Sequence, residues 1–247
     1  MRFFDASCRL GRPAAPAEGL PWQTEAVLEL MERCRIDNAL AWHIVAKDGE
    51  TADGTELLLE EIKDHPQLQP QWCALPATYD EFLPADRLHA AMKENGVRTL
   101  RIAPKSFAHS MAPYAMGELM DMAAACKVPV FFDYGEAPFD AMYELCHAYP
   151  EVNFVITNTA YALNRWLGPV LDSCPNLYLA TGNYVAHNGL QTFCRYYSAE
   201  RLVFNTNLPT GSATAAVSLV CFADISKEEK ELIAHGNIER LLGEVRL

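Results

Sequence analysis

The feature that most constrains the fold of this chain is a regular alternation between short apolar runs and amphipathic stretches, which continues along the whole sequence. Short runs rich in branched and aromatic residues are typical of buried strands, while apolar residues repeated every three or four positions indicate helices. We predict strands at Phe3–Ala6, Asn38–His43, Gln69–Ala74, Thr99–Ile102, Pro129–Phe132, Asn153–Thr157, Leu177–Ala180 and Leu202–Phe204.

A helical pattern follows each predicted strand. In the first, Val27, Leu28 and Met31 share one face, and we expect Thr24 to cap the helix. Ser226 is expected to cap the last helix, whose first turn is acidic, as the helix dipole prefers. The predicted helices are Thr24–Arg33, Glu56–Lys63, Arg87–Asn95, Tyr114–Cys126, Ala137–Ala148, Asn164–Ser173, Gly189–Tyr196, Thr214–Ala223 and Lys227–Leu242.

Strict alternation of strand and helix predicts a parallel sheet covered by helices. Such a sheet either closes into a barrel or stays open and doubly wound. No GxGxxG or Walker loop follows a predicted strand, which disfavours a nucleotide-binding open sheet. A length of 247 residues suits one barrel, and no Pro/Gly/Ser-rich linker divides the chain. We therefore predict an α/β fold, a single (β/α)8 TIM barrel over residues 1–247.

Charge and cysteine usage narrow the range of partners and compartments. The net charge of −12 argues against nucleic acid and anionic membranes as partners. The first residues, MRFFDASCRLG, lack the pattern of a signal peptide, and no apolar run is long enough to span a membrane. The 8 cysteines are at least 20 positions apart, which favours reduced, buried thiols over a disulfide framework. We expect a cytoplasmic protein.

Polar residues gather directly after the predicted strands. In a barrel these positions converge on one mouth, where binding and catalytic groups normally lie. The residues concerned are Asp5, Ser7, Cys8, Arg9, His43, Lys105, His109, Asp133, Tyr134, Glu136, Asn158, Tyr161, Asn183, Tyr184, His187, Asn205, Thr206 and Asn207. They include cations, carboxylates and amides that together suit a small polar ligand. A barrel that has lost its activity but keeps polar residues for solubility would also show a polar rim.

Two of these residues, Cys8 and Lys105, are candidate nucleophiles, but each also has a simpler structural or binding role open to it. Cys8 lies between Ser7 and Arg9, so strand alternation places its thiol on the opposite side of the strand, in the core, if its neighbours face the lumen. Lys105 could act as a Schiff-base or general-base lysine if burial lowers its pKa, but it equally suits a carboxylate or phosphate site or a solvated loop.

The strand ends carry motifs in a familiar order: FFDASCRLG, VPVFFDYGEA, FVITNTAY, RLVFNTNLP and the final EEKELIAHGNIERLLG. With these motifs the chain resembles the amidohydrolase superfamily, in particular its small decarboxylase-like and lactonase-like barrels. The resemblance covers nearly the full length. It implies a TIM barrel, a hydrolase-type activity and a divalent metal such as zinc held at the mouth.

The residues at the implied metal positions depart from this pattern. The family's first motif, Asp-x-His-x-His, retains Asp5 but has Ser7 and Arg9 in place of the histidines. The histidine of strand 6 and the aspartate of the last strand become the amides Asn158 and Asn207, and an amide cannot act as a general base. Only Asp133 remains a strong ligand, so we predict no cofactor and no metal ligands of the family type. A rebuilt site using His43, His109 or His187 is the alternative.

Three functions are compatible with these residues. The first is an amidohydrolase-related hydrolase or lyase acting without the family's metal on a small polar or anionic substrate; its catalytic residues would be Asp133, His109 and Lys105. The second is a non-catalytic metabolite-binding or assembly protein, and the third a hydrolase with a relocated metal. We expect a small-molecule ligand, neither nucleic acid nor membrane as partner, and a possible homo-oligomer. The predicted substrate-binding residues are Arg9, Ser7, Tyr134, Asn158, Asn183, His187 and Asn207.

Overall fold

The computed structural model describes residues 1–79, 81–160 and 164–247. Its strands pair in parallel and in sequence order, β1 to β3 in one set and β4 to β9 in the other. The strands are β1 (Phe3–Leu10), β2 (Ile36–His43), β3 (Leu68–Pro70), β4 (Trp72–Cys73), β5 (Leu100–Arg101), β6 (Val130–Asp133), β7 (Phe154–Thr157), β8 (Leu177–Ala180) and β9 (Leu202–Val203).

Two junctions join these sets into a closed barrel. β3 and β4 are one strand interrupted at the buried Gln71, whose N–H donates to Ala41 O at 2.8 Å. At the other junction, Ala6 N–H donates to Phe204 O, beyond β9, at 2.9 Å. The predicted strand 69–74 is therefore present in two pieces, and the barrel is the predicted (β/α)8 type.

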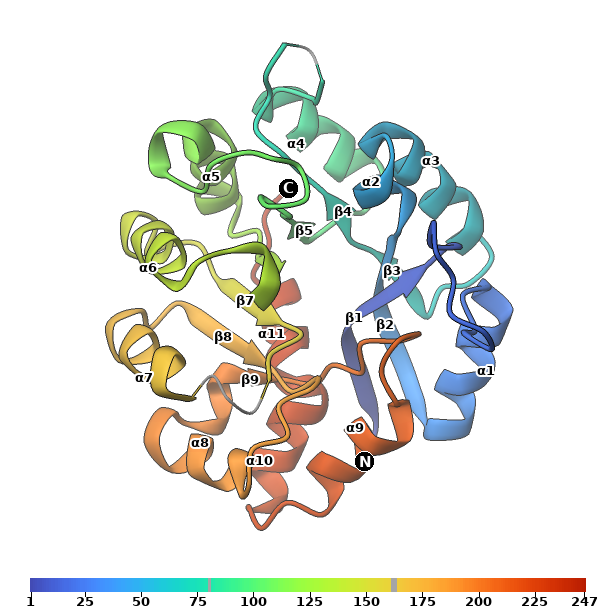
Figure 1. Ribbon diagram of the computed structural model, residues 1–247, viewed down its shortest axis with the longest axis vertical. Coiled ribbons are helices and arrows are strands. Elements are labelled where there is room, and N and C mark those ends of the chain that lie inside the picture. Colours follow the sequence, from blue (N-terminus) through green and yellow to red (C-terminus); the bar gives the residue numbers. More distant parts are fainter. Residues whose placement is uncertain (80, 161–163) are drawn as a thin grey trace.

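Helices α1 and α3 to α9 form a ring around the strands in the order of the sequence, while α11 lies behind the centre of the barrel (Figure 1). Among the described residues, every helix is too short or too polar to traverse a lipid bilayer. The helices are α1 (Thr24–Cys34), α2 (Val45–Asp48), α3 (Thr51–Ile62), α4 (Ala85–Glu94), α5 (Pro113–Cys126), α6 (Phe139–Ala148), α7 (Asn164–Ser173), α8 (Gly189–Tyr197), α9 (Ala213–Cys221), α10 (Lys227–Glu231) and α11 (Asn237–Gly243), with short turns η1 (Tyr134–Glu136), η3 (Ala199–Arg201) and the π-helical η4 (Leu232–Gly236).

One predicted helix cap is wrong and another is confirmed. Gln23 precedes α1, and the Thr24 hydroxyl donates instead to Glu61 Oε2 at 2.8 Å, because Glu61 of α3 lies beside it. Ser226 caps α10 as predicted, in a reciprocal capping box with Glu229. At the start of α1 the threonine hydroxyl therefore bonds to a tertiary partner and not to the backbone of its own helix.

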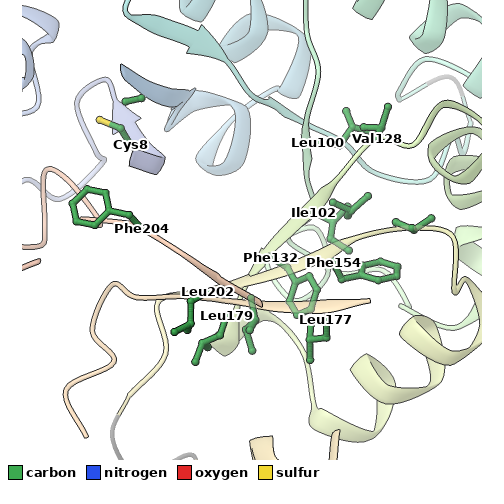
Figure 2. Close-up of a cluster of buried hydrophobic side chains, with 14 of the residues drawn as sticks. Cys8, Leu100, Ile102, Val128, Phe132, Phe154, Leu177, Leu179, Leu202 and Phe204 are labelled. Carbon is green, nitrogen blue, oxygen red and sulfur yellow. The ribbon is translucent and has the colours of Figure 1, made fainter. Parts of the chain in front are cut away.

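The core has two layers. Outward-facing strand residues pack against the helices, and Figure 2 shows part of this layer, with the rings of Phe132 and Phe154 edge to face at 6.4 Å. Inward-facing residues fill the lumen beneath the mouth, where α11 supplies apolar side chains that close the lower end. The lumenal cluster comprises Phe4, Ala6, Leu40, Phe131, Val155, Tyr178, Ala180, Val203, Ile238, Leu241 and Leu242.

Candidate active site

A cavity of about 340 Å³ lies at the carboxyl ends of the strands, directly above the apolar lumen. Its size is at the small end of the range for ligand sites. Its lining residues are Ser7, Arg9, Trp42, Ile44, Lys47, Asp48, Arg101, Asp133, Asn158, Asn207, Leu208 and Thr210. The lining includes three cations and two carboxylates, in a chain whose net charge is −12. The mouth is therefore more positive than the rest of the surface.

Arg101 occupies the floor of this mouth cavity. Its Nη1 lies 3.1 Å from Asp133 Oδ1, and its side chain is only 4% exposed. Nη2 donates to Ser7 Oγ at 2.6 Å and to Thr157 Oγ1 at 3.3 Å. Nε donates to Gln71 Oε1 at 3.3 Å, so the guanidinium contacts four different segments of the barrel wall.

The indole of Trp42 completes the surroundings of this cation. The guanidinium carbon of Arg101 lies 4.8 Å from the centre of the Trp42 ring, a cation–π arrangement. Leu100 and Ile102 on either side of Arg101 face the helices and are fully buried, so strand alternation directs Arg101 alone into the lumen.

Asp133, at the end of β6, is held as an anion by these contacts. Burial raises the pKa of its carboxyl, but the charge of Arg101 and the hydrogen bond donated by Thr157 Oγ1 at 2.6 Å bring that pKa below its ordinary value. At neutral pH Asp133 is ionised, so it can accept a proton but has none to donate.

Arg9 is the cation of the mouth cavity that has no carboxylate within 4.0 Å among the described residues. Its Nε is buried and has no hydrogen-bond partner within the same part of the chain. Burial lowers its pKa, while the charge of Asp48 acts in the opposite direction. A guanidinium keeps its charge in proteins, so Arg9 is a cation available to an anionic ligand.

A buried carboxylate, Asp5, supports the mouth from below. Its Oδ1 accepts from the N–H groups of Ser7 at 3.1 Å and Thr206 at 3.0 Å, and Oδ2 accepts from the Thr206 hydroxyl. Asn205 Nδ2 donates to Asp5 Oδ1 at 3.3 Å and to Ser7 O at 2.9 Å. Full burial raises the pKa of Asp5 to about 6 despite these hydrogen bonds.

Asparagines follow three successive strands at the rim. Asn158, Asn183 and Asn207 all have positive φ, at 55°, 62° and 56°, a conformation that asparagine adopts more easily than most residues. Asn158 Oδ1 accepts from Asn183 Nδ2 at 2.6 Å and from Asn207 Nδ2 at 3.4 Å. The three predicted binding amides are thus brought together.

Lys105 and His109, by contrast, line an adjoining cavity of about 580 Å³ together with Tyr134 and Glu136. Burial lowers the pKa of His109, whose Nε2 has no partner among the described residues. Between the two cavities Lys47 Nζ donates to Glu136 Oε1 at 2.6 Å, and Glu136 also accepts from the backbone and hydroxyl of Ser106. The predicted catalytic set is therefore split, with Asp133 on one side and Lys105 and His109 on the other.

Three further residues that follow the predicted strands, Cys8, Tyr184 and His187, do not line the mouth cavity. Cys8 is in the sheet–helix core, as strand alternation predicts, and burial raises the pKa of its thiol. Tyr184 is also in that core, packed against Phe193, because the chain turns back there. His187 is exposed beside Asn188 and does not line the mouth cavity. Tyr161 lies outside the described residues.

The donor set does not suit a family-type metal ion. Ser7 and Asp133, at two of the implied ligand positions, both accept hydrogen bonds or ion pairs from Arg101. Arg9 is a second permanent cation, and a divalent ion at the same oxygens would be repelled by both. In the part of the chain that the structure describes, no group of three or more His, Cys, Asp or Glu side chains could hold a metal. His43 uses both ring nitrogens within the chain, since Nε2 lies 3.4 Å from Glu61 Oε1 and Nδ1 accepts from Val45 N–H at 3.3 Å, so it offers no free ligand atom to a rebuilt site.

Sequence reasoning missed Arg101, Lys47, Gln71 and Thr157. A usable signal existed for Arg101, since an arginine between apolar residues of a strand that is covered by helices can be accommodated only on the lumenal face. Lys47 belongs to α2, which follows β2 closely and has too few residues for a periodic pattern. Gln71 and Thr157 give no signal beyond their strand positions.

Fold and site together define a TIM barrel with a charged polar mouth. A family model described as "Amidohydrolase" matches residues 12–243, and the chain belongs to that family. No curated protein matches it.

Several solved structures share the fold at low identity. A TIM-barrel protein from Bordetella bronchiseptica, described as uncharacterized, is 16% identical, with a TM-score of 0.76 and 99% of each chain covered. A 2,6-dihydroxybenzoate decarboxylase from Rhizobium is 13% identical, with a TM-score of 0.77 and 98% of this chain and 99% of that chain covered. A dihydroxybenzoic acid decarboxylase from a Polaromonas species, with bound manganese and the inhibitor 2-nitroresorcinol, is 13% identical, with a TM-score of 0.74 and coverage of 98% and 97%.

Proposed function

We propose that the chain binds a small organic anion, such as a carboxylate, in the mouth cavity and acts on it as a hydrolase or lyase without a family-type metal centre. The observation that carries this proposal is the guanidinium of Arg9, which lines the cavity and has no ion-pair partner among the described residues. The decarboxylases of the same fold named above act on anionic aromatic acids, which is consistent with an anion as substrate.

Four residues that line the mouth cavity have roles in this proposal. Arg9 binds the anionic group, and Asn158 and Asn207 orient the rest of the ligand through their carboxamides. Asp133, ionised at neutral pH, accepts a proton from the substrate or from water. Lys105, His109 and Tyr134 would contact only the part of a longer substrate that reaches the adjoining cavity.

Ligand-dependent thermal stability tests the binding step. Small mono-, di- and hydroxycarboxylates, screened at millimolar concentration, should include ligands that raise the melting temperature; a ligand at about 100 times its Kd adds about 2.7 kcal/mol, or roughly 5–10 °C for a chain of this size. Arg9→Met should abolish the shift. Arg12→Met, an exposed arginine outside the cavity, should leave it unchanged.

Absence of any stabilising anion, or a shift that survives in Arg9→Met, would contradict the proposal. Ligands found in this way are then incubated with the protein and followed by NMR for hydrolysis or carbon dioxide release. Asp133→Asn should retain binding and lose turnover.

A second candidate is a non-catalytic metabolite-binding or assembly protein. It is favoured by the separation of Asp133 from Lys105 and His109 and by the ion pair that occupies Asp133. Binding without turnover of any ligand by the wild-type chain supports this second candidate over the enzyme.

A further inference from the structure

We infer that the guanidinium of Arg101 is the resident cation of the mouth, in the structural and electrostatic place that a divalent ion takes in a metal-containing barrel of this family. The inference rests on the proposed function in one respect, namely that the mouth works without a bound metal. It adds the residue that replaces the metal.

The first argument is the reach of the Arg101 contacts. Within the described part of the chain, β5, which carries Arg101, pairs with β4 and β6 and with no other strand. Yet Arg101 also contacts Ser7 on β1 and Thr157 on β7, neither of which adjoins β5. Arg101 therefore links strands that lie across the lumen from one another, as a metal ion coordinated from several strand ends does. An ion pair within a sheet usually joins only adjacent strands.

The second argument is that every nitrogen of the Arg101 guanidinium has an acceptor. A buried guanidinium is costly unless its N–H groups find acceptors. Here Nε, Nη1 and Nη2 each have an oxygen partner, from Gln71, Asp133, and Ser7 with Thr157. Among the described residues Asp133 is the one carboxylate partner and balances the charge of Arg101, while the other acceptors are the neutral oxygens of Gln71, Ser7 and Thr157.

The third argument is that the cation and a metal ion are mutually exclusive. Ser7 Oγ and Asp133 Oδ1 are within 3.1 Å of Arg101 nitrogens. An ion coordinated by these oxygens would meet the guanidinium at close range in a buried setting, where like charges repel strongly. Arg101 therefore prevents a metal ion from binding at the Ser7 and Asp133 oxygens. Arg101 also acts as a positioning residue, because its ion pair fixes the carboxylate of Asp133.

The first test measures metal content and metal dependence. We expect full-length protein, purified without chelators from cells supplied with manganese and zinc, to contain far less than one ion per chain. Its melting temperature should not change with EDTA. A stoichiometric ion whose removal lowers the melting temperature would overturn the inference, even if Arg9 still binds anions as proposed.

The second test is a double-mutant cycle between Arg101 and Asp133. Arg101→Met leaves a buried carboxylate without its cation and should lower the melting temperature by about 6–12 °C. Adding Asp133→Asn should recover most of the lost melting temperature. Arg101→Lys, which keeps the charge but not the several planar N–H donors of the guanidinium, should have an intermediate melting temperature. Arg98→Met, which precedes β5 and lies outside the mouth, is the matched control and should cost much less.

Additive losses in the double variant would overturn the inference, because simple packing by Arg101 predicts no coupling with the charge of Asp133. Anion binding in the Arg9 experiment is independent of this cycle. The two ideas can therefore fail separately.

Discussion

Replacement of Gly182 by alanine tests how tightly the mouth is supported. A Cβ at this position would lie 2.1 Å from Asn205 Oδ1 and 2.7 Å from Asn207 Nδ2, both far inside ordinary contact distance. Asn205 cannot move freely, because it is fully buried and donates to Ser7 O and Asp5. Alanine must therefore displace Asn205 and break hydrogen bonds around the buried carboxylate.

The expected loss combines two effects. Overpacking costs about 1–3 kcal/mol, and buried hydrogen bonds left unmade add about 1–2 kcal/mol. We expect Gly182→Ala to lose about 3 kcal/mol in the free energy of unfolding, measured by urea titration, and about 6–12 °C in melting temperature. Gly243→Ala is the control, since its added Cβ would have no described atom within 4 Å apart from its chain neighbours and the backbone of its own helix. Equal stability of the two variants would refute the tight support that we describe.

Three further predictions concern charges and caps. The pKa of Asp5 is raised to about 6 in the folded chain, so the protonated carboxyl stabilises the fold below the unfolded pKa, and this stabilisation should be lost as pH rises through about 6. Urea titrations between pH 4 and pH 7 should therefore show a free energy of unfolding that falls with pH, and Asp5→Asn should remove this fall. Ser226→Ala should cost about 1 kcal/mol in the same assay, since the capping box is lost. Lys47→Met should cost about 2 kcal/mol by calorimetry because it leaves the buried Glu136 without its cation, whereas Lys63→Met, in the exposed pair with Glu60, should have no measurable effect.

The barrel could be predicted because the two periodicities are strong where both faces of a strand are buried. The predicted strands Asn153–Thr157 and Leu177–Ala180 match β7 and β8 within one residue, since each apolar run is bounded by polar residues. β1 extends to Leu10, beyond the predicted end at Ala6, because Ser7 and Arg9 face a polar lumen and so break the apolar pattern without ending the strand. Sequence patterns report hydrophobicity, whereas β1 stays almost entirely buried as far as Leu10 although Ser7 and Arg9 are polar.

The site could be predicted in part. The strand-end rule placed Asp133, Arg9 and Asn158 correctly at one cavity, because carboxyl ends of parallel strands converge. It could not show that Arg101, rather than Arg9, would pair with Asp133, since alternation gives the face of a side chain but not its reach across the lumen. Nor could it show the ion pair that separates Lys105 from Asp133, because that pair joins residues 89 positions apart.

The apolar plug supplied by α11 has a consequence for synthesis of the chain. Phe4 and Leu40 face a lumen whose lower end is covered by Ile238 and Leu241. During translation the early strands emerge long before this cover exists, so their inward side chains stay open to water until residues near 241 have left the ribosome. The barrel therefore cannot complete its interior strand by strand, and the nascent chain carries an exposed apolar surface that invites chaperones or aggregation until the last helix docks.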